Sequence, residues 1–265
     1  MDLPSTVAGT GGVRGRRPAV GEPVLDRAFR LLGCFQPGDA ALSLASLSAR
    51  TAIPKATALR LARKLVELGA LERQDDGSYV PGLRLLELAS LAPRGHGLRA
   101  IALPYMEDLH VATRQHVLLA VREEHASVLV ERLSAHEAGR VMYRVGGRMP
   151  LHATGVGLVL LAHADFATRE EVLRTPLIIE PEGIRVSDFA VRRRLDAVRR
   201  EGVAVMARPH PEPMVSLAAP IFGRGGEIVA AVSVVAPDGG PRPRELRAAV
   251  VTTARAISRG LLAPG

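Results

Sequence analysis

The stretch "IPKATALRLARKLVELGAL", from Ile53 to Leu71, predicts a short amphipathic helix. With about 100° of rotation per residue, its apolar side chains gather on one face. That face comprises Ala58, Leu61, Ala62, Leu65, Val66 and Leu68. Pro54 suits the first turn, where its missing N–H removes no hydrogen bond, and Gly69 suits the position just beyond the end. We therefore expect a helix whose leucines pack against the rest of a small module.

The opposite face of this helix is basic and has a hydroxyl near its start. It carries Thr57, Arg60, Arg63, Lys64 and Glu67, and Lys55 lies with Thr57 at the N-terminal end of the helix. No acidic residue lies between Asp39 and Glu67, whereas Arg50 falls in the same interval. A narrow cationic ridge suits the DNA major groove, where arginine pairs with guanine edges and lysine contacts phosphates. The alternative to DNA binding is that these charges lie on an ordinary surface face and contact only solvent.

The neighbouring segments favour the DNA interpretation. Residues 24–35 and 42–53 predict two further short helices, and residues 70–82 predict two strands joined by an Asp76-Gly77 turn. Three short helices followed by a hairpin are typical of a winged helix-turn-helix domain. At the hairpin, Arg73 and Ser78 would approach phosphates. The predicted DNA-binding residues are Arg50, Lys55, Thr57, Arg60, Arg63, Lys64, Arg73 and Ser78.

The rest of the chain predicts an α+β domain with an antiparallel sheet and flanking helices. The expected strands are 116–123, 126–133, 140–146, 203–207, 214–222 and 227–236, and the expected helices are 154–164, 168–174, 188–202 and 243–262. In the helix at 188–202, Phe189, Leu195 and Val198 are expected to point inward. We divide the chain into a Gly-rich, disordered tail (1–21), the winged helix-turn-helix domain (22–83), connector helices (84–113) and a second domain (114–265).

Composition sets outer limits on the class of protein. The chain has 265 residues, of which 47% are hydrophobic, and a formal net charge of +8. Its longest apolar runs are about half of the roughly 20 residues that a membrane span needs, and no secretory signal is evident. Cys34 is the only cysteine, which excludes an internal disulfide framework and a Cys-rich zinc site. We expect a cytoplasmic protein without a cofactor, a metal or a membrane partner.

Several segments together resemble the IclR family of bacterial transcriptional regulators. The carriers are "IPKATALRLARKLVELGALER", "GSYVPGLRLLELA", "GGRMPLHATGVGLVLLA", "LDAVRREGVAV", "LAAPIF" and "GEIVAAVSV", in the family's order and approximate spacing. The resemblance covers residues 24 to 260. It implies a winged helix that binds palindromic double-stranded operators as a homodimer or dimer of dimers. It also implies a GAF-like effector-binding domain for a small molecule, often a carboxylate.

The resemblance also implies an effector pocket, at which this chain departs from the family. Met206 stands where members often carry an acid, Ser216 where they often carry a cysteine, and Val235 where a serine is common. The N–H groups of Gly155 and Val156 remain well placed to bind an anion at a helix start. Arg208 or His210 would supply a compensating cation. The predicted effector-binding residues are Gly155, Val156, Met206, Arg208, Ser216, Leu217, Ser233 and Val235.

This pattern favours a larger or aromatic ligand, and the alternative is a pocket that has lost its effector. An enzyme with Ser216, His152 and Asp188 as a triad lacks an exposed nucleophile turn, so we predict no catalytic residues. His152 is expected instead to hydrogen-bond the helix that follows it. His110 and His116 lack the spacing of a metal site. A dimeric interaction protein without DNA is the remaining alternative.

Overall fold

The computed structural model describes residues 22–36, 38–135, 138–139, 141–179, 183–209 and 212–263. The chain divides into two compact units, Met1–Glu87 and Leu88–Gly265. The predicted tail at 1–21 and His210 lie outside the described residues. Within the described ranges, no helix is long and apolar enough to cross a lipid bilayer.

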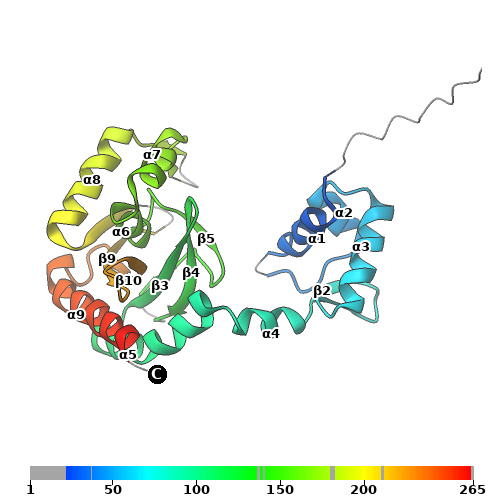
Figure 1. Ribbon diagram of the computed structural model, residues 1–265, viewed down its shortest axis with the longest axis horizontal. Coiled ribbons are helices and arrows are strands. Elements are labelled where there is room, and N and C mark those ends of the chain that lie inside the picture. The colour runs from blue at the N-terminus through cyan, green and yellow to red at the C-terminus, as the bar shows by residue number, and fades with distance from the viewer. Residues whose placement is uncertain are drawn as a thin grey trace, which may run out of the picture. The chain divides into compact units, whose positions relative to one another are not determined.

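The first unit consists of three helices and a hairpin (Figure 1). Its elements are α1 (Val24–Gly33), α2 (Leu44–Thr51), α3 (Lys55–Glu67), β1 (Leu71–Arg73) and β2 (Tyr79–Pro81), followed by the start of α4 (Arg84–Ser90). One hydrophobic core joins them, with Leu31, Leu47 and Tyr79 fully buried. Leu42 also pairs with Tyr79 through two backbone hydrogen bonds of 2.8 and 2.9 Å, a contact that the sequence did not predict. The hairpin is thereby tied to the loop before α2.

Local signals place the boundaries of α2 and α3. The Ser43 hydroxyl accepts the N–H of Ser46 at 3.1 Å and caps α2. Pro54 precedes the first residue of α3, and Gly69, with φ of +72°, follows its end in the left-handed region that glycine favours. The expectation that Leu68 points inward is wrong. It lies beyond the last helical residue and is 59% exposed, because the chain leaves the helical face there.

The second unit is built on a six-stranded antiparallel sheet in the order β5-β4-β3-β10-β9-β8. The strands are β3 (His116–Glu123), β4 (Ala126–Leu133), β5 (Arg148–Pro150), β8 (Ala204–Arg208), β9 (Met214–Phe222) and β10 (Ile228–Pro237). The strand expected at 140–146 is wrong. Its described residues form a loop, because the chain turns at Gly146, whose φ is +77°, before pairing as β5.

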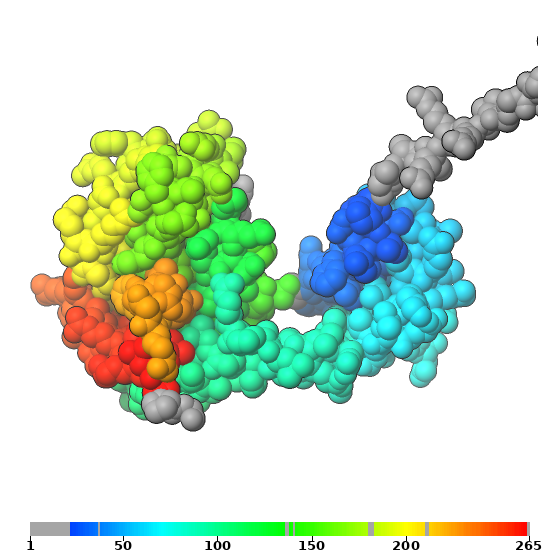
Figure 2. Space-filling view, viewed as in Figure 1, coloured from blue at the N-terminus to red at the C-terminus, as the bar shows by residue number. Residues whose placement is uncertain are grey.

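Helices cover both faces of this sheet (Figure 1). On one face lie α6 (Gly155–Ala162), α7 (Phe166–Arg174) and α8 (Asp188–Glu201), and on the other lie α5 (Leu98–Thr113) and α9 (Pro243–Leu262). In the space-filling view, α8 (yellow) and α9 (red) form separate parts of the surface of this unit (Figure 2). A π-helix (Pro93–Gly97) precedes α5, and β6 (Ile178–Ile179) pairs with β7 (Ile184–Arg185) outside the main sheet. Leu195 and Val198 of α8 are buried, but Phe189 is 66% exposed, so its expected inward position is wrong. It lies in the first turn, before the helix meets the sheet side.

An irregular pairing of β3 with β4 sets the direction of two charged side chains. Leu119 pairs with Glu131 and Ala120 with Leu129, so Val130 is an extra residue in β4. Glu131 forms an ion pair with Arg99 of α5. The next residue, Arg132, donates to the Tyr143 carbonyl at 2.7 Å in the loop before β5. Adjacent residues of one strand therefore bind structures on opposite faces of the sheet.

Candidate nucleic-acid interface and ligand cavity

The two faces of α3 differ in the way that the sequence predicted. Ala58, Leu61, Ala62 and Leu65 are buried in the core of the first unit. The side chains on the other face are exposed, apart from Thr57, which is half-buried. The exposed cations are Lys55, Arg60, Arg63 and Lys64. Helix α3 therefore presents a row of cations to solvent while its apolar face fixes its position.

Three of these four cations have no acidic partner. Among the described residues, no carboxylate lies within ion-pair distance of Lys55, Arg60 or Arg63, whereas Lys64 pairs with Glu67 at 2.7 Å. Because exposed ion pairs of this kind are weak, Glu67 only partly offsets the charge of Lys64. The surface thus retains the positive field that attracts phosphates.

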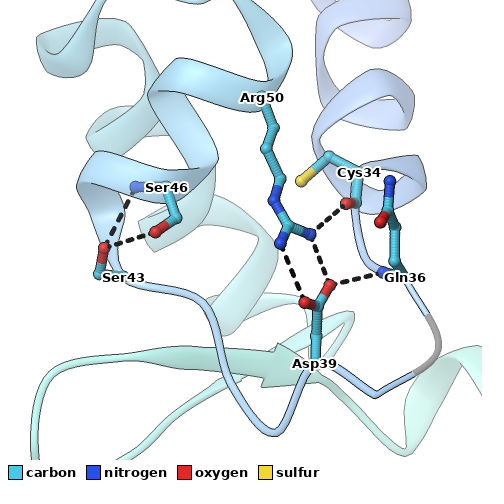
Figure 3. A network of polar contacts seen from close by, with 6 residues as sticks. All are labelled: Cys34, Gln36, Asp39, Ser43, Ser46 and Arg50. Atoms are coloured by element: carbon cyan, nitrogen blue, oxygen red, sulfur yellow. Dashed lines mark hydrogen bonds and ion pairs between the residues drawn. The ribbon is translucent and has the colours of Figure 1, made fainter.

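Arg50 has a different environment from the cations of α3 (Figure 3). Its guanidinium donates to both carboxylate oxygens of Asp39, at 2.5 and 2.9 Å, and to the Cys34 carbonyl at 3.1 Å. The side-chain hydrogen bonds from Arg50, followed by the N–H of Gln36, lower the pKa of Asp39. Arg50 therefore joins α2 to the loop after α1. Arg50 was predicted to bind DNA because it lies in the interval without acidic residues. Asp39, which precedes that interval, is its partner.

The hairpin places its two predicted residues in unequal positions. Arg73 is exposed on β1. Ser78 donates its hydroxyl to Asp76 at 2.5 Å and its N–H to the same oxygen at 2.8 Å. These two bonds lower the pKa of Asp76 and shape the turn. Arg73 is thus available to a phosphate, while the hydroxyl of Ser78 already has an acceptor.

The second unit contains a cavity between the sheet and the N-terminal end of α6. Its volume is about 80 Å³, and the whole hollow with its open mouth reaches about 640 Å³. The lining residues are Leu118, Val141, Met142, Tyr143, Met149, Ala153, Thr154, Gly155, Val156, Met206, Arg208, Glu212, Met214, Ser216, Ser233 and Val235. The cavity volume of about 80 Å³ is smaller than that of a cavity known to hold benzene, about 150 Å³. A ring-sized ligand would therefore also occupy the mouth or widen the cavity.

At the inner end of the cavity, α6 approaches β9 very closely. A Cβ added to Gly155 would lie 2.5 Å from the Ser216 hydroxyl oxygen, so the serine side chain would have to move to make room for it. The Thr154 hydroxyl accepts the N–H of Gly157 at 3.0 Å and caps the helix. Among the described residues, the N–H groups of Gly155 and Val156 have no acceptor. The cavity therefore ends at a helix N-terminus with partial positive charge.

In the lining of the cavity, Arg208 of β8 contacts Tyr143. Its guanidinium donates to the tyrosine oxygen at 3.0 Å and lies 5.9 Å from the ring centroid. His116 fixes another part of the same loop, because its ring donates to the Gly139 carbonyl and accepts the N–H of Ala135. Burial lowers the pKa of His116, which favours the neutral ring that these two bonds require.

The structure brings together most of the predicted effector-binding residues. Those lining the cavity are Gly155, Val156, Met206, Arg208, Ser216, Ser233 and Val235. Leu217 does not line the cavity, so its predicted place in the site is wrong. It follows Ser216 on β9, so strand alternation turns it to the opposite face, where it is buried against the α5 and α9 side.

Sequence reasoning missed the loop from Val141 to Tyr143 and the lining residues Met149, Glu212 and Met214. The alternating pattern at 140–146 suggested a strand, and nothing local indicated that this segment would cover a cavity. Four methionines line it. Their flexible side chains can adjust to ligand shape, but this becomes visible only once the fold is known.

The residues of the rejected catalytic triad each have other partners. The His152 ring donates to the Ile178 carbonyl at 2.9 Å, so it binds β6 and not the helix that follows it. Asp188 is exposed and pairs with Arg192 at 3.7 Å. The Ser216 hydroxyl donates to the Met206 carbonyl at 3.5 Å. In the part of the chain that the structure describes, no three histidine, cysteine or acidic side chains are grouped as metal ligands would be.

Comparisons with known proteins agree with this architecture. Residues 24–75 match the family model of the IclR helix-turn-helix domain. Residues 92–259 match that of the bacterial transcriptional regulator IclR C-terminal domain. The match to the C-terminal model covers more than half of the chain.

The matches to individual relatives cover from 73% to 91% of this chain. The glycerol operon regulatory protein of Streptomyces coelicolor is 31% identical over 244 residues, which cover 89% of this chain and 95% of that protein. The regulator KipR of Bacillus subtilis is 28% identical over 73% of this chain and 78% of its own length. An IclR homologue from Microbacterium hydrocarbonoxydans, crystallised with 4-hydroxybenzoate, is 35% identical and has a TM-score of 0.81. The match covers 91% of this chain and all of that one.

Proposed function

The chain belongs to the IclR family of transcriptional regulators, and from this premise we propose that α3 reads specific operator DNA under control of an aromatic carboxylate. The observation that carries the DNA part is the row of exposed cations on α3, opposite a buried apolar face. A palindromic operator would present two half-sites to a homodimer or a dimer of dimers, about one helical turn apart. The protein would act in the cytoplasm and perform no catalysis.

The effector part of the proposal rests on the cavity. Its lining is mainly apolar and includes four methionines, the N-terminus of α6 and Arg208. Such a site suits a ligand with a flat apolar body and an anionic group. The homologue crystallised with 4-hydroxybenzoate supports this ligand class for the present chain.

Arginine substitutions test the DNA part. Duplexes that bind the full chain are first selected from a random-sequence pool, and affinities are then measured by fluorescence anisotropy. Arg60→Ala is expected to relax sequence preference at one position and cost about 1–3 kcal/mol, because a guanine contact is lost. Lys64→Ala is expected to weaken all duplexes alike and reduce the salt slope by about one.

The matched control is Arg193→Ala, which removes the same charge from an exposed position on α8. It should leave both affinity and preference close to those of the unaltered chain. Equal losses from Arg60→Ala and Arg193→Ala would contradict base reading by α3. An effector is tested separately, by the change in operator affinity when 4-hydroxybenzoate is added. No change with it or with other aromatic carboxylates would favour a regulator whose cavity binds no effector.

A further inference from the structure

We propose that Ala56 reads the methyl group of a thymine in each operator half-site, close to the guanine that Arg60 contacts. The inference rests on the proposed function, namely that α3 reads operator DNA, and adds the base pairs that the N-terminal end of the helix selects. Ala56 is uncharged and is not among the residues that the sequence predicted to bind DNA.

The first observation is the direction in which Ala56 points. Helix α3 turns by about 100° per residue, so one stripe of its surface lies opposite the mean direction of its four buried residues. This outward stripe consists of exposed residues, namely Ala56, Arg60, Arg63 and Glu67. The side chains about 70–110° to either side of its centre are Lys55, Thr57 and Lys64. In a major groove, the outward stripe would face the base edges and the flanking side chains would face the phosphates.

The second observation is the order of the residues along this stripe. Ala56 is the second residue of α3, at the end where recognition helices contact base edges. Arg60 follows one turn later, about 6 Å along the helix axis. Base pairs are about 3.4 Å apart, so the pair that Ala56 reads lies next to the pair that Arg60 reads or one step further. Glu67 is about 16 Å from Ala56 along the axis, in the last turn, where it pairs with Lys64.

The third observation is the chemistry of an alanine side chain. Its methyl group neither donates nor accepts a hydrogen bond, and thymine is the base that presents a methyl group in the major groove. Opposite any other base, Ala56 would displace water from a donor or acceptor and leave that group unpaired, which is unfavourable. Opposite thymine, two apolar groups are removed from water together. Ala56 therefore favours a T·A base pair, whereas Arg60 favours guanine.

Removal of one methyl group from either partner tests the proposal. Duplexes selected with the full chain from a random-sequence pool should hold a thymine at most about two base-pair steps from the guanine whose preference Arg60→Ala relaxes. Replacing this thymine by uracil, which lacks only the methyl group, should weaken binding about fourfold for each half-site in fluorescence anisotropy. Ala56→Gly should bind the thymine and uracil duplexes equally. Because this ratio is taken within one variant, a change in the stability of the helix does not alter it.

The matched control is Ala45→Gly, which removes a methyl group from the second residue of α2, also exposed. It introduces glycine at the same position of a helix and should keep the preference for thymine over uracil. Equal binding of the two duplexes by the unaltered chain, or an unchanged ratio in Ala56→Gly, would overturn the inference and leave DNA reading by Arg60 intact. Loss of the ratio in Thr57→Ser alone would assign the methyl contact to Thr57 and also overturn it. If the unaltered chain prefers no duplex sequence, both the inference and the proposed DNA reading fail.

Discussion

Helices α3 and α6 lie at the two candidate sites and differ in how much of their surface is exposed. Helix α3 buries one face and exposes the other, so its side chains are free to contact a partner. All eight residues of α6 are buried, and Gly155 and Val156 at its start line the cavity. A binding surface made of side chains on one face of a helix produces a periodic pattern in the sequence. A site made of backbone N–H groups produces no such pattern and depends on the residues that pack around it. The two sites should therefore respond differently to substitution.

The largest expected effect tests the buried face of α3. Leu61→Ala should lower the free energy of unfolding of the first unit by about 2–5 kcal/mol, because it leaves a cavity in a small core. Urea denaturation followed by circular dichroism measures this change. Leu68→Ala, at a position that is 59% exposed, is the matched control and should change stability by less than about 0.5 kcal/mol. Similar losses from both substitutions would mean that α3 does not have two distinct faces.

An intermediate effect is expected at the start of α6. Gly155→Ala should destabilise the second unit by about 1–3 kcal/mol, because the new Cβ would overlap the Ser216 oxygen. Scanning calorimetry measures the shift in its unfolding transition. The double variant Gly155→Ala with Ser216→Ala should recover most of the loss, since the remaining contacts, at 3.4 and 3.5 Å, are ordinary. A single variant as stable as the parent, or a double variant no better than the single, would contradict this close approach.

The smallest expected effect is on the pH dependence of stability. It compares the ion pair of Arg50 with Asp39 with the exposed ion pair on α3. The pKa of Asp39 is lowered by Arg50, so this pair contributes stability that is fully present above about pH 4 and is lost as the pH falls through the lower folded pKa. In acid titrations followed by circular dichroism, Asp39→Asn should remove this part of the pH dependence. The control Glu67→Gln alters the exposed pair on α3. An unchanged acid profile in Asp39→Asn would assign the Arg50 contact no role in stability.

The spacing of apolar residues was sufficient to predict most of the helices and strands. The apolar spacing of α3 and the apolar segments of β9 and β10 predicted these elements close to their observed limits. The family and the mixed helix and sheet architecture are confirmed. The failures arose where tertiary contacts decide. Gly146 turns the expected strand into a loop, and the single-residue step from Ser216 to Leu217 crosses the sheet.

The partners of charged side chains were the least predictable feature. Arg50 was grouped with the α3 cations because both occur in one acid-free interval, but its partner, Asp39, lies across a loop at 2.5 Å. Tyr143 was assigned to a strand, and its position over the cavity depends on Arg132 and Arg208, which are distant in sequence. Such contacts are fixed by the assembled fold, and a single sequence contains no periodic record of them.

The extra residue in β4 has a thermodynamic consequence. One peptide bond links Glu131, which holds α5 through Arg99, to Arg132, which holds the loop over the cavity. If a ligand that displaces this loop also alters the contact of Glu131 with Arg99, ligand binding and the attachment of α5 are linked. Linkage of this kind is reciprocal, so a constraint placed on α5 changes the ligand's dissociation constant by the same factor as the ligand changes the helix equilibrium.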